Sequence, residues 1–131
     1  EHIGKNNITK YFQQVKLLMV YKTKFLLSTP NYDEKVGAAG NHTYDSGDGR
    51  GKAVQEFDHK ELEEEILRNG FTIEQKFGTF ASQTHYKPLM NDWQKNMFEE
   101  LGKYYDTNLM SVLMAPMFPE QSRNCLWVLR R

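Results

Sequence analysis

Apolar residues near the start of the chain recur with the spacing of one helical face. Between residues 7 and 19 they stand mostly three or four positions apart, with lysine and glutamine on the opposite side. The apolar positions are Ile8, Tyr11, Phe12, Val15, Leu18 and Met19. This pattern predicts an amphipathic helix with one buried stripe.

A short apolar run, Phe-Leu-Leu at residues 25–27, follows this helix. Such a run is typical of a strand covered on both faces. Pro30 should end the strand, because proline has no N–H to donate to a sheet. In open α/β sheets the ligand lies beyond the carboxyl ends of the strands. We therefore expect Asn31 and Tyr32, which follow Pro30, to line a substrate-binding cleft.

A second helix is marked at both of its ends. Asp58 is a suitable N-cap, and Glu61 three residues later completes the pattern of a capping box. Phe57 precedes the cap and Leu62 follows it at the spacing of a hydrophobic staple. Gly70 is a suitable residue to end the helix, so the sequence predicts a helix over residues 58–69.

Four further elements follow in the sequence. Partial alternation over residues 71–80 predicts a strand near a sheet edge. A helical stripe over 91–105, capped by Asn91, predicts a helix that packs on the sheet or over the site. Residues 108–114 are expected to form a short helix, and the apolar run 125–129 predicts a buried strand.

The composition is ordinary for one globular domain or a large piece of one. The 131 residues are 39% hydrophobic, with 17 basic and 17 acidic side chains, so nothing indicates nucleic acid or an anionic membrane as partner. The single Cys125 excludes an internal disulfide. Its apolar neighbours predict a buried, inert thiol, and a reducing cytoplasm is the simplest location. No apolar run approaches the about 18 residues of a membrane span.

The order of these segments resembles the second half of class I S-adenosylmethionine-dependent methyltransferases. In that family a tripeptide like Glu1-His2-Ile3 follows the fourth strand, and a turn like Ser-Thr-Pro-Asn at residues 28–31 ends the fifth. The resemblance continues through the helix over 58–69 to the closing strand at 124–129. It implies an α/β, Rossmann-like methyltransferase fold in which this closing strand runs antiparallel between the fifth and sixth.

The resemblance also implies what the chain does not contain. The family's glycine-rich cofactor loop, and the acidic residue that ends its second strand, would both precede residue 1. Residues 1–131 are therefore expected to be the C-terminal half of a single methyltransferase domain, with strands five to seven. The absence of an initiator methionine agrees with a fragment or a processed product. The partner is then the N-terminal half, or another chain that covers the exposed sheet edge.

Glu1 and His2 are the catalytic candidates that the resemblance implies. The family's tripeptide lies beside the methyl donor and the receiving atom, so His2 would take a proton from the acceptor as a general base. In the alternative interpretation the pair starts a helix, with the carboxylate near backbone N–H groups and the imidazole holding a loop.

A glycine-rich loop at residues 37–51 follows the Pro30 turn and holds five of the nine glycines. A long loop of this kind is either a substrate lid or a flexible insertion. We expect His42 and Tyr44 within it to contact the substrate. Residues 45–51 spell a cofactor-loop pattern of spaced glycines, but no buried strand feeds them, so we interpret the match as coincidence.

The remaining candidates have plainer interpretations. His59 falls in the first turn of a helix and is expected at the surface, and residues 61–65 are expected to form a solvated face. His85 is expected in a solvated loop, with contact to the substrate as the alternative. Small RNA 2′-O-methyltransferases in this superfamily hold a metal with a Glu-x-x-Glu-His pattern and a further histidine. Here the first glutamate would precede residue 1 and Val54 stands at the position of that histidine, so no metal ligand is assigned unless His42 of the loop substitutes. The methionines Met110, Met114 and Met117 are expected to fill the core, or else to form an adaptable apolar wall.

Together these features predict methyl transfer from S-adenosylmethionine to an O or N acceptor, with this chain supplying the substrate-side half. Two other classes stay open. One is a non-catalytic binding module derived from the same fold, and the other is a different enzyme on an α/β scaffold.

Overall fold

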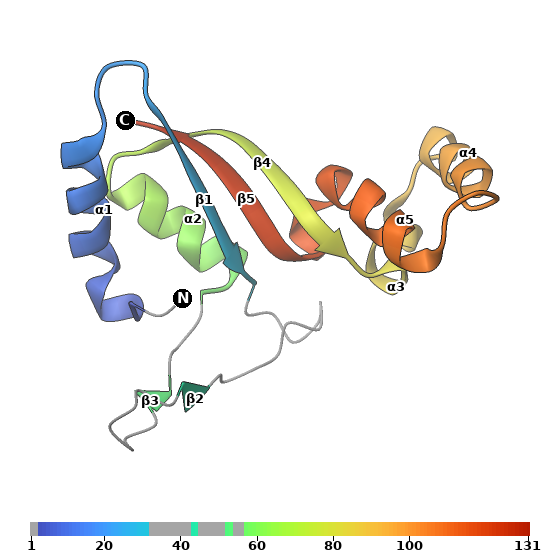
Figure 1. Cartoon of the computed structure of the whole chain (residues 1–131), viewed down its shortest axis with the longest axis horizontal. Coiled ribbons are helices and arrows are strands. Elements are labelled where there is room, and N and C mark those ends of the chain that lie inside the picture. The colour runs from blue at the N-terminus through green and yellow to red at the C-terminus, as the bar shows by residue number, and fades with distance from the viewer. Residues whose placement is uncertain (1–2, 32–42, 45–51, 54–56) are drawn as a thin grey trace.

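A three-stranded antiparallel sheet organises the chain (Figure 1). The structure is a computed structural model that describes residues 3–31, 43–44, 52–53 and 57–131. The strand order is β1 (Lys24–Pro30), β5 (Ser122–Arg130) and β4 (Thr72–Ala81). The last strand thus lies in the middle and runs antiparallel to both neighbours. This confirms the predicted placement of the closing strand and the prediction that residues 71–80 form a strand at a sheet edge.

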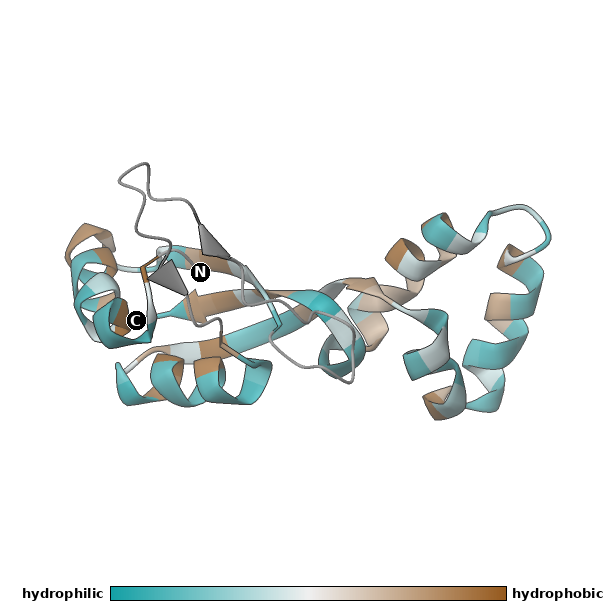
Figure 2. Ribbon diagram, turned by 90° about the horizontal axis from the view of Figure 1, so that it is seen from below, coloured by the Kyte–Doolittle hydropathy of each residue, from teal (hydrophilic) through white to brown (hydrophobic). Residues whose placement is uncertain are grey.

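Two helices cover one face of this sheet. They are α1 (Ile8–Leu18), entered through the 3-10 turn η1 (Lys5–Asn7), and α2 (His59–Arg68). In Figure 2 α2 is mostly teal, whereas α1 alternates between teal and brown stretches. Their apolar sides meet the alternate residues of β5 that face them in one core. Its buried members are Ile8, Phe12, Met19, Leu62, Ile66, Phe71, Cys125, Trp127 and Leu129.

The second helix starts as its sequence predicts. The Asp58 carboxylate accepts a hydrogen bond from the Glu61 N–H at 2.7 Å, and the Glu61 carboxylate accepts one from the Asp58 N–H at 3.2 Å. Gly70 ends the segment with φ +72°, a left-handed conformation that glycine adopts without a steric penalty. The predicted second helix and its capping box are therefore confirmed. The helix predicted over residues 7–19 also forms, as α1.

The prediction that β1 is covered on both faces is wrong. Phe25 and Leu27 point toward the helices, whereas Leu26 between them is 61% exposed. Side chains of a strand alternate between its two faces, and Leu26 lies on the face opposite α1 and α2. β1 is also an edge strand in the described sheet, since β5 is its only neighbour there. A continuous apolar run thus marks a strand without fixing how many of its faces are buried.

A helical insertion, residues 83–121, separates β4 from β5 and lies at the far end of these strands, which makes the molecule elongated (Figure 1). It has its own core, formed by Ala81 at the end of β4 with Tyr86, Met90, Met110, Met114, Ala115 and Phe118. Its elements are α3 (Gln83–Tyr86), η3 (Lys87–Leu89), α4 (Asp92–Leu101), α5 (Thr107–Met114), η4 (Ala115–Met117) and η5 (Pro119–Gln121).

The helices of the insertion form where the sequence predicts them, but their packing differs from the prediction. Asn91 caps α4 and α5 forms as predicted, and Met110 and Met114 are buried core residues. The prediction that α4 packs on the sheet or over the site is wrong, because its half-buried residues pack into the core of the insertion. Trp93 and Met117 are exposed, so the buried stripe of α4 is narrower than predicted and only two of the three methionines fill the core.

A small ladder joins the predicted glycine-rich loop to the residues that directly follow it. β2 (Thr43–Tyr44) pairs antiparallel with β3 (Lys52–Ala53). The rest of residues 37–51, including the glycine pattern at 45–51, lies outside the described residues. Among the described residues no helix has both the length and the apolar character needed to cross a membrane. The predicted cytoplasmic location stays a prediction.

Candidate functional site

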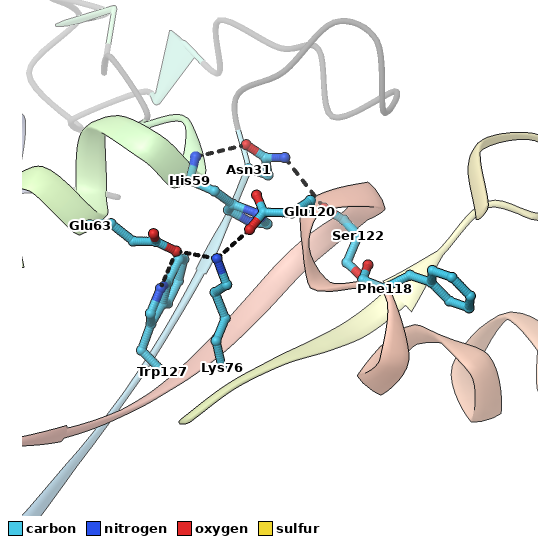
Figure 3. Close-up of polar contacts among 8 residues, drawn as sticks. All are labelled: Asn31, His59, Glu63, Lys76, Phe118, Glu120, Ser122 and Trp127. Atoms are coloured by element: carbon cyan, nitrogen blue, oxygen red, sulfur yellow. Dashed lines mark hydrogen bonds and ion pairs between the residues drawn. The ribbon is translucent and has the colours of Figure 1, made fainter. Parts of the chain in front are cut away.

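Asn31 joins three elements at the carboxyl end of β1 (Figure 3). Its backbone N–H donates to the Arg123 carbonyl at 2.7 Å, and its side-chain Nδ2 donates to the Ser122 carbonyl at 3.4 Å. Its Oδ1 accepts a hydrogen bond from the backbone N–H of His59 at 3.0 Å. The side chain is 2% exposed. Asn31 therefore fixes the first turn of α2 against the end of β1 and the start of β5, a positioning role that the sequence did not predict.

His59 is buried, so the prediction that it lies at the surface is wrong. The residue is 4% exposed, and its ring stands edge-on to the indole of Trp127 with the centroids 5.2 Å apart. Neither ring nitrogen has a hydrogen-bond partner among the described residues. The sequence did carry a signal for this burial, because His59, Leu62 and Ile66 occupy one face of the helix at i, i+3 and i+7.

Burial keeps the His59 ring uncharged. Burial lowers the pKa of His59, because the protonated ring loses its hydration. The Glu120, Glu63 and Asp58 carboxylates act in the opposite direction, and the Lys76 ammonium adds to the lowering. Since burial outweighs the carboxylates, His59 is a neutral base near neutral pH.

A charged network connects β4, α2 and the end of the insertion beside this ring. The Lys76 ammonium lies 2.5 Å from a Glu63 oxygen and also pairs with Glu120. The Trp127 indole N–H donates to the same Glu63 oxygen at 3.3 Å. Burial acts to lower the pKa of Lys76, but its hydrogen bonds to the two carboxylates raise the pKa overall. Glu63 is thus a structural partner, although residues 61–65 were predicted to be a solvated face.

Two hollows lie near the point where β1 ends and α2 begins. The polar hollow, about 240 Å³, is lined by Asn31, Asp58, His59, Lys60 and Glu120. The apolar hollow, about 260 Å³, lies among the start of the chain, α1, the end of β1 and α2. Ile3 and Thr29 both line it. The segment that follows Glu1 and His2 therefore lies near residues 28 and 29, which belong to β1 and not to the turn predicted at residues 28–31.

Most of the predicted site residues are not described structurally. Glu1, His2, Tyr32 and His42 lie outside the described residues, and Tyr44 is described only by its backbone in β2. Of the predicted set, Asn31 alone is placed, beside His59. His85 lies in α3 of the insertion, half-buried, and its Nδ1 has no hydrogen-bond partner in the described part of the chain. It is therefore not in the predicted solvated loop.

The described residues do not form a complete site for S-adenosylmethionine. Each of these two hollows is smaller than the roughly 300–1,000 Å³ of a typical small-molecule site, and a larger hollow of about 500 Å³ lies away from them, at residues 19–23 and 130–131. Gly70, Gly78 and Gly102 do not lie in a turn from a strand into a following helix, where a cofactor loop would cradle the ligand. Among the described residues, no group of three or more histidine, cysteine or acidic side chains is arranged to hold a metal.

Comparison with known proteins adds no relative. No family model, no curated protein and no solved structure matches the chain.

Proposed function

We propose that this chain is the substrate-side half of a class I methyltransferase that transfers a methyl group from S-adenosylmethionine to an O or N acceptor. The observation that supports this most is the position of β5, antiparallel between β1 and β4. The resemblance implies this order for the last three strands of the family. A strand inserted between two earlier ones is an uncommon arrangement, since consecutive elements are usually neighbours.

Two local features support the same proposal. Ser28 and Thr29 lie at the end of β1 and line the apolar hollow together with Ile3. This brings the segment after His2 close to the carboxyl end of a strand, where open sheets bind their ligands. In addition, the outer edge of β1 has no partner among the described strands, which suits pairing with a fourth strand from the rest of such a domain.

Within this proposal the chain contributes to the acceptor side. S-adenosylmethionine would supply an electrophilic methyl group, and its adenosine contacts would come mainly from residues outside those described. His2 keeps its proposed role as the base, with Glu1 beside it, and Tyr32, His42 and Tyr44 keep theirs as substrate contacts. Asn31 acts indirectly, because its side-chain oxygen is already bound to the first turn of α2.

Calorimetric titration with S-adenosylhomocysteine tests the proposal. The 131-residue chain should be compared with the protein made from the complete reading frame that encodes it. Binding by the longer protein alone would support a half-domain. Binding by both would mean that this chain carries a cofactor site, and would make residues 45–51 the first candidate for it. Absence of binding by both would overturn the proposal.

A non-catalytic binding module is the second candidate, favoured by one observation on α5. Leu109, Val112 and Leu113 form an apolar face at i, i+3 and i+4, and each is more than 40% exposed. Exposed apolar faces of this kind commonly mark interaction sites. A protein that fails to bind S-adenosylhomocysteine, and self-associates in a way that Leu113→Lys abolishes, would favour this alternative.

A further inference from the structure

We propose that the end of α1 and the turn into β1 dock onto a membrane surface that carries anionic phospholipids. The apolar side chains of residues 17–21, here called the apolar tip, would enter the acyl region, and the cations around them would contact the phosphates. This interaction does not depend on methyl transfer. The turn lies at the amino end of β1, whereas the candidate site around Asn31 lies at the carboxyl end (Figure 1). A membrane at the turn would therefore leave the candidate site uncovered.

Four large apolar side chains are exposed together in the apolar tip. Leu17, Leu18, Val20 and Tyr21 are each at least 75% exposed. Met19 between them is buried in the core beneath α1 and α2. It anchors the segment while its neighbours stay in solvent. Single exposed apolar residues are common on proteins, but a contiguous group of them marks an interaction surface.

Positive charge surrounds the apolar tip. Residues 2–32 contain five lysines and no acidic residue, although the formal net charge of the whole chain is zero. The hollow of about 500 Å³ beside the tip is lined by residues 19–23, which include Lys22, and by Arg130 and Arg131. No acidic side chain of the described residues lines this hollow. The neutral total therefore conceals a local excess of cations at one end of the molecule.

Glu74 neutralises only part of this local charge. Its carboxylate pairs with both Lys24 and Arg130, so two cations share one anion. Lys22 and Arg131 have no carboxylate partner among the described side chains, and the Arg131 guanidinium donates instead to a backbone carbonyl at 3.2 Å. Even a terminal carboxylate at Arg131 would leave cations in excess. The surface around the tip is thus complementary to an external anion.

The backbone of Lys22 supports a role for its side chain. Its φ is +69°, and no other described residue except glycine has a positive φ. Glycine adopts this left-handed conformation without a steric penalty, whereas lysine does not. The Lys22 ammonium lies 5.4 Å from the ring centroid of Tyr21. A cation and an aromatic ring therefore stand together at the tip, and residues of both kinds favour the boundary between lipid and water.

This combination fits a phospholipid surface better than a nucleic acid or a protein. A nucleic acid would use the cations but gain little from Leu17, Leu18 and Val20. A specific protein interface needs a broader surface than a turn that projects beyond the sheet (Figure 1). An anionic bilayer uses both features, because apolar side chains bind in its interface while lysine and arginine contact its headgroups.

Co-sedimentation with lipid vesicles tests the proposal, on the 131-residue chain and on the protein made from the complete reading frame. The vesicles contain phosphatidylcholine alone, or phosphatidylcholine and phosphatidylserine in equal amounts. We expect both proteins to bind the anionic vesicles at least about tenfold more tightly than the neutral ones, with most of that preference lost at high salt. Equal binding to the two vesicles, or no binding, would overturn the proposal. Binding by the shorter chain alone would overturn it as well, because the rest of the protein then covers the tip.

A pair of double variants tests the apolar contribution. Leu17→Gln with Leu18→Gln keeps good helix formers but removes the exposed apolar groups, and should weaken binding to anionic vesicles at least about tenfold. Leu109→Gln with Leu113→Gln, on the exposed face of α5, is the matched control and should leave the affinity within about twofold of its original value. Equal losses for the two pairs would mean unspecific apolar adhesion and would contradict docking through the tip.

Lys22→Gly tests the charge without disturbing the fold. Glycine relieves the left-handed strain and adds flexibility to the unfolded chain, and these effects offset each other, so the thermal midpoint should stay unchanged. Binding to anionic vesicles should weaken about fivefold. A single-stranded RNA provides phosphates without an acyl region. If it displaces the chain from the vesicles, and the variants at Leu17 and Leu18 keep full affinity for both, the surface is a nucleic-acid site and the proposal fails.

Discussion

The two cores of this chain are built from different residues. Three aromatic rings are buried beneath α1 and α2, where Phe12 and Phe71 lie 5.3 Å apart between centroids and Trp127 is fully buried. Methionines are more frequent in the helical insertion, where Met90, Met110 and Met114 are buried beside the stacked rings of Tyr86 and Phe118. Aromatic rings pack with defined geometry, whereas methionine adapts to irregular space. The candidate site is attached to the first core, because His59 packs against Trp127.

The surfaces of α5 and α2 also differ. On α5 the apolar side chains of Leu109, Val112 and Leu113 are exposed. On α2, Glu61 and Glu64 are exposed while Glu63 pairs with Lys76. The contrast is confined to these two helices, because the sheet region also exposes apolar side chains such as Leu17, Leu18 and Leu26.

The two tryptophans provide the largest expected contrast. Trp127→Ala should lower the free energy of unfolding by about 3–5 kcal/mol, because it empties a fully buried site and removes the packing against His59. Trp93→Ala, at a residue that is 65% exposed in the insertion, should change it by no more than about 0.5 kcal/mol. Urea denaturation measures both. Similar losses for the two variants would contradict the assignment of Trp127 to a separate, tightly packed core.

The junction of the two regions is expected to be the next most sensitive place. At Gly78 in β4, an added Cβ would overlap the Ser122 hydroxyl and the carbonyl oxygen of Ala115 in η4. Gly78→Ala should therefore cost about 1–3 kcal/mol through overpacking. Gly102→Ala is the matched control, because φ is −63° there and the nearest atom to the new Cβ would be the Phe98 carbonyl oxygen at 3.1 Å. A smaller loss at Gly78 than at Gly102 would mean that the insertion moves freely relative to β4.

The pH dependence of stability should arise partly from His59. Its pKa in the folded chain lies below the usual 6.5, so the folded state binds fewer protons than the unfolded state as the pH falls. The associated stability is present above pH 6.5 and is lost as the pH drops through the lowered value, at up to about 1.4 kcal/mol per pH unit. Glu120, Glu63, Asp58 and Lys76 are the charged groups that influence this titration.

Denaturation midpoints at pH 7 and 5.5 measure that effect. His59→Phe should show a flatter dependence than the unmodified chain, because the groups that titrate elsewhere contribute equally to both proteins. Parallel dependences would mean that His59 titrates in the folded chain as it does in the unfolded chain.

The smallest expected effect is the difference in stability loss between one substitution in each core. Met114→Leu conserves volume in the insertion and should cost less than about 1.5 kcal/mol. Phe12→Leu should cost more, since it also removes a ring pair with Phe71, worth about 0.5–1.5 kcal/mol beyond the buried area. Thermal unfolding of both variants is sufficient. The comparison of the cores would be wrong if the methionine substitution were the more damaging of the two.

The features that depend on neighbouring residues were predictable from the sequence. The capping box at Asp58, the cap at Asn91 and the exit at Gly70 all form where the sequence places them. Each depends on atoms within a few residues of chain, so local chemistry is sufficient to specify it. The placement of the closing strand between β1 and β4 came from family resemblance and could not be derived from periodicity.

The features that depend on distant residues were not predictable. Leu26 is exposed because of which face the helices cover, and His59 is buried because Trp127, 68 positions later in the chain, lies against its ring. The bond from His59 to Asn31 likewise spans 28 residues. In each case the decisive partner is remote in sequence, and a histidine is compatible with either environment until the partner is known.

The central position of β5 also determines when the sheet can form during synthesis. Residues 122–130 are the last of the three sheet strands to leave the ribosome, and both other strands bond only to them among the described strands. Until then β1 and β4 remain with unpaired edges, a state in which strands tend to associate with other chains. Long-range pairing of this kind also slows folding. We therefore expect translation that stalls before residue 122 to yield an aggregation-prone nascent chain rather than a folded sheet lacking one strand.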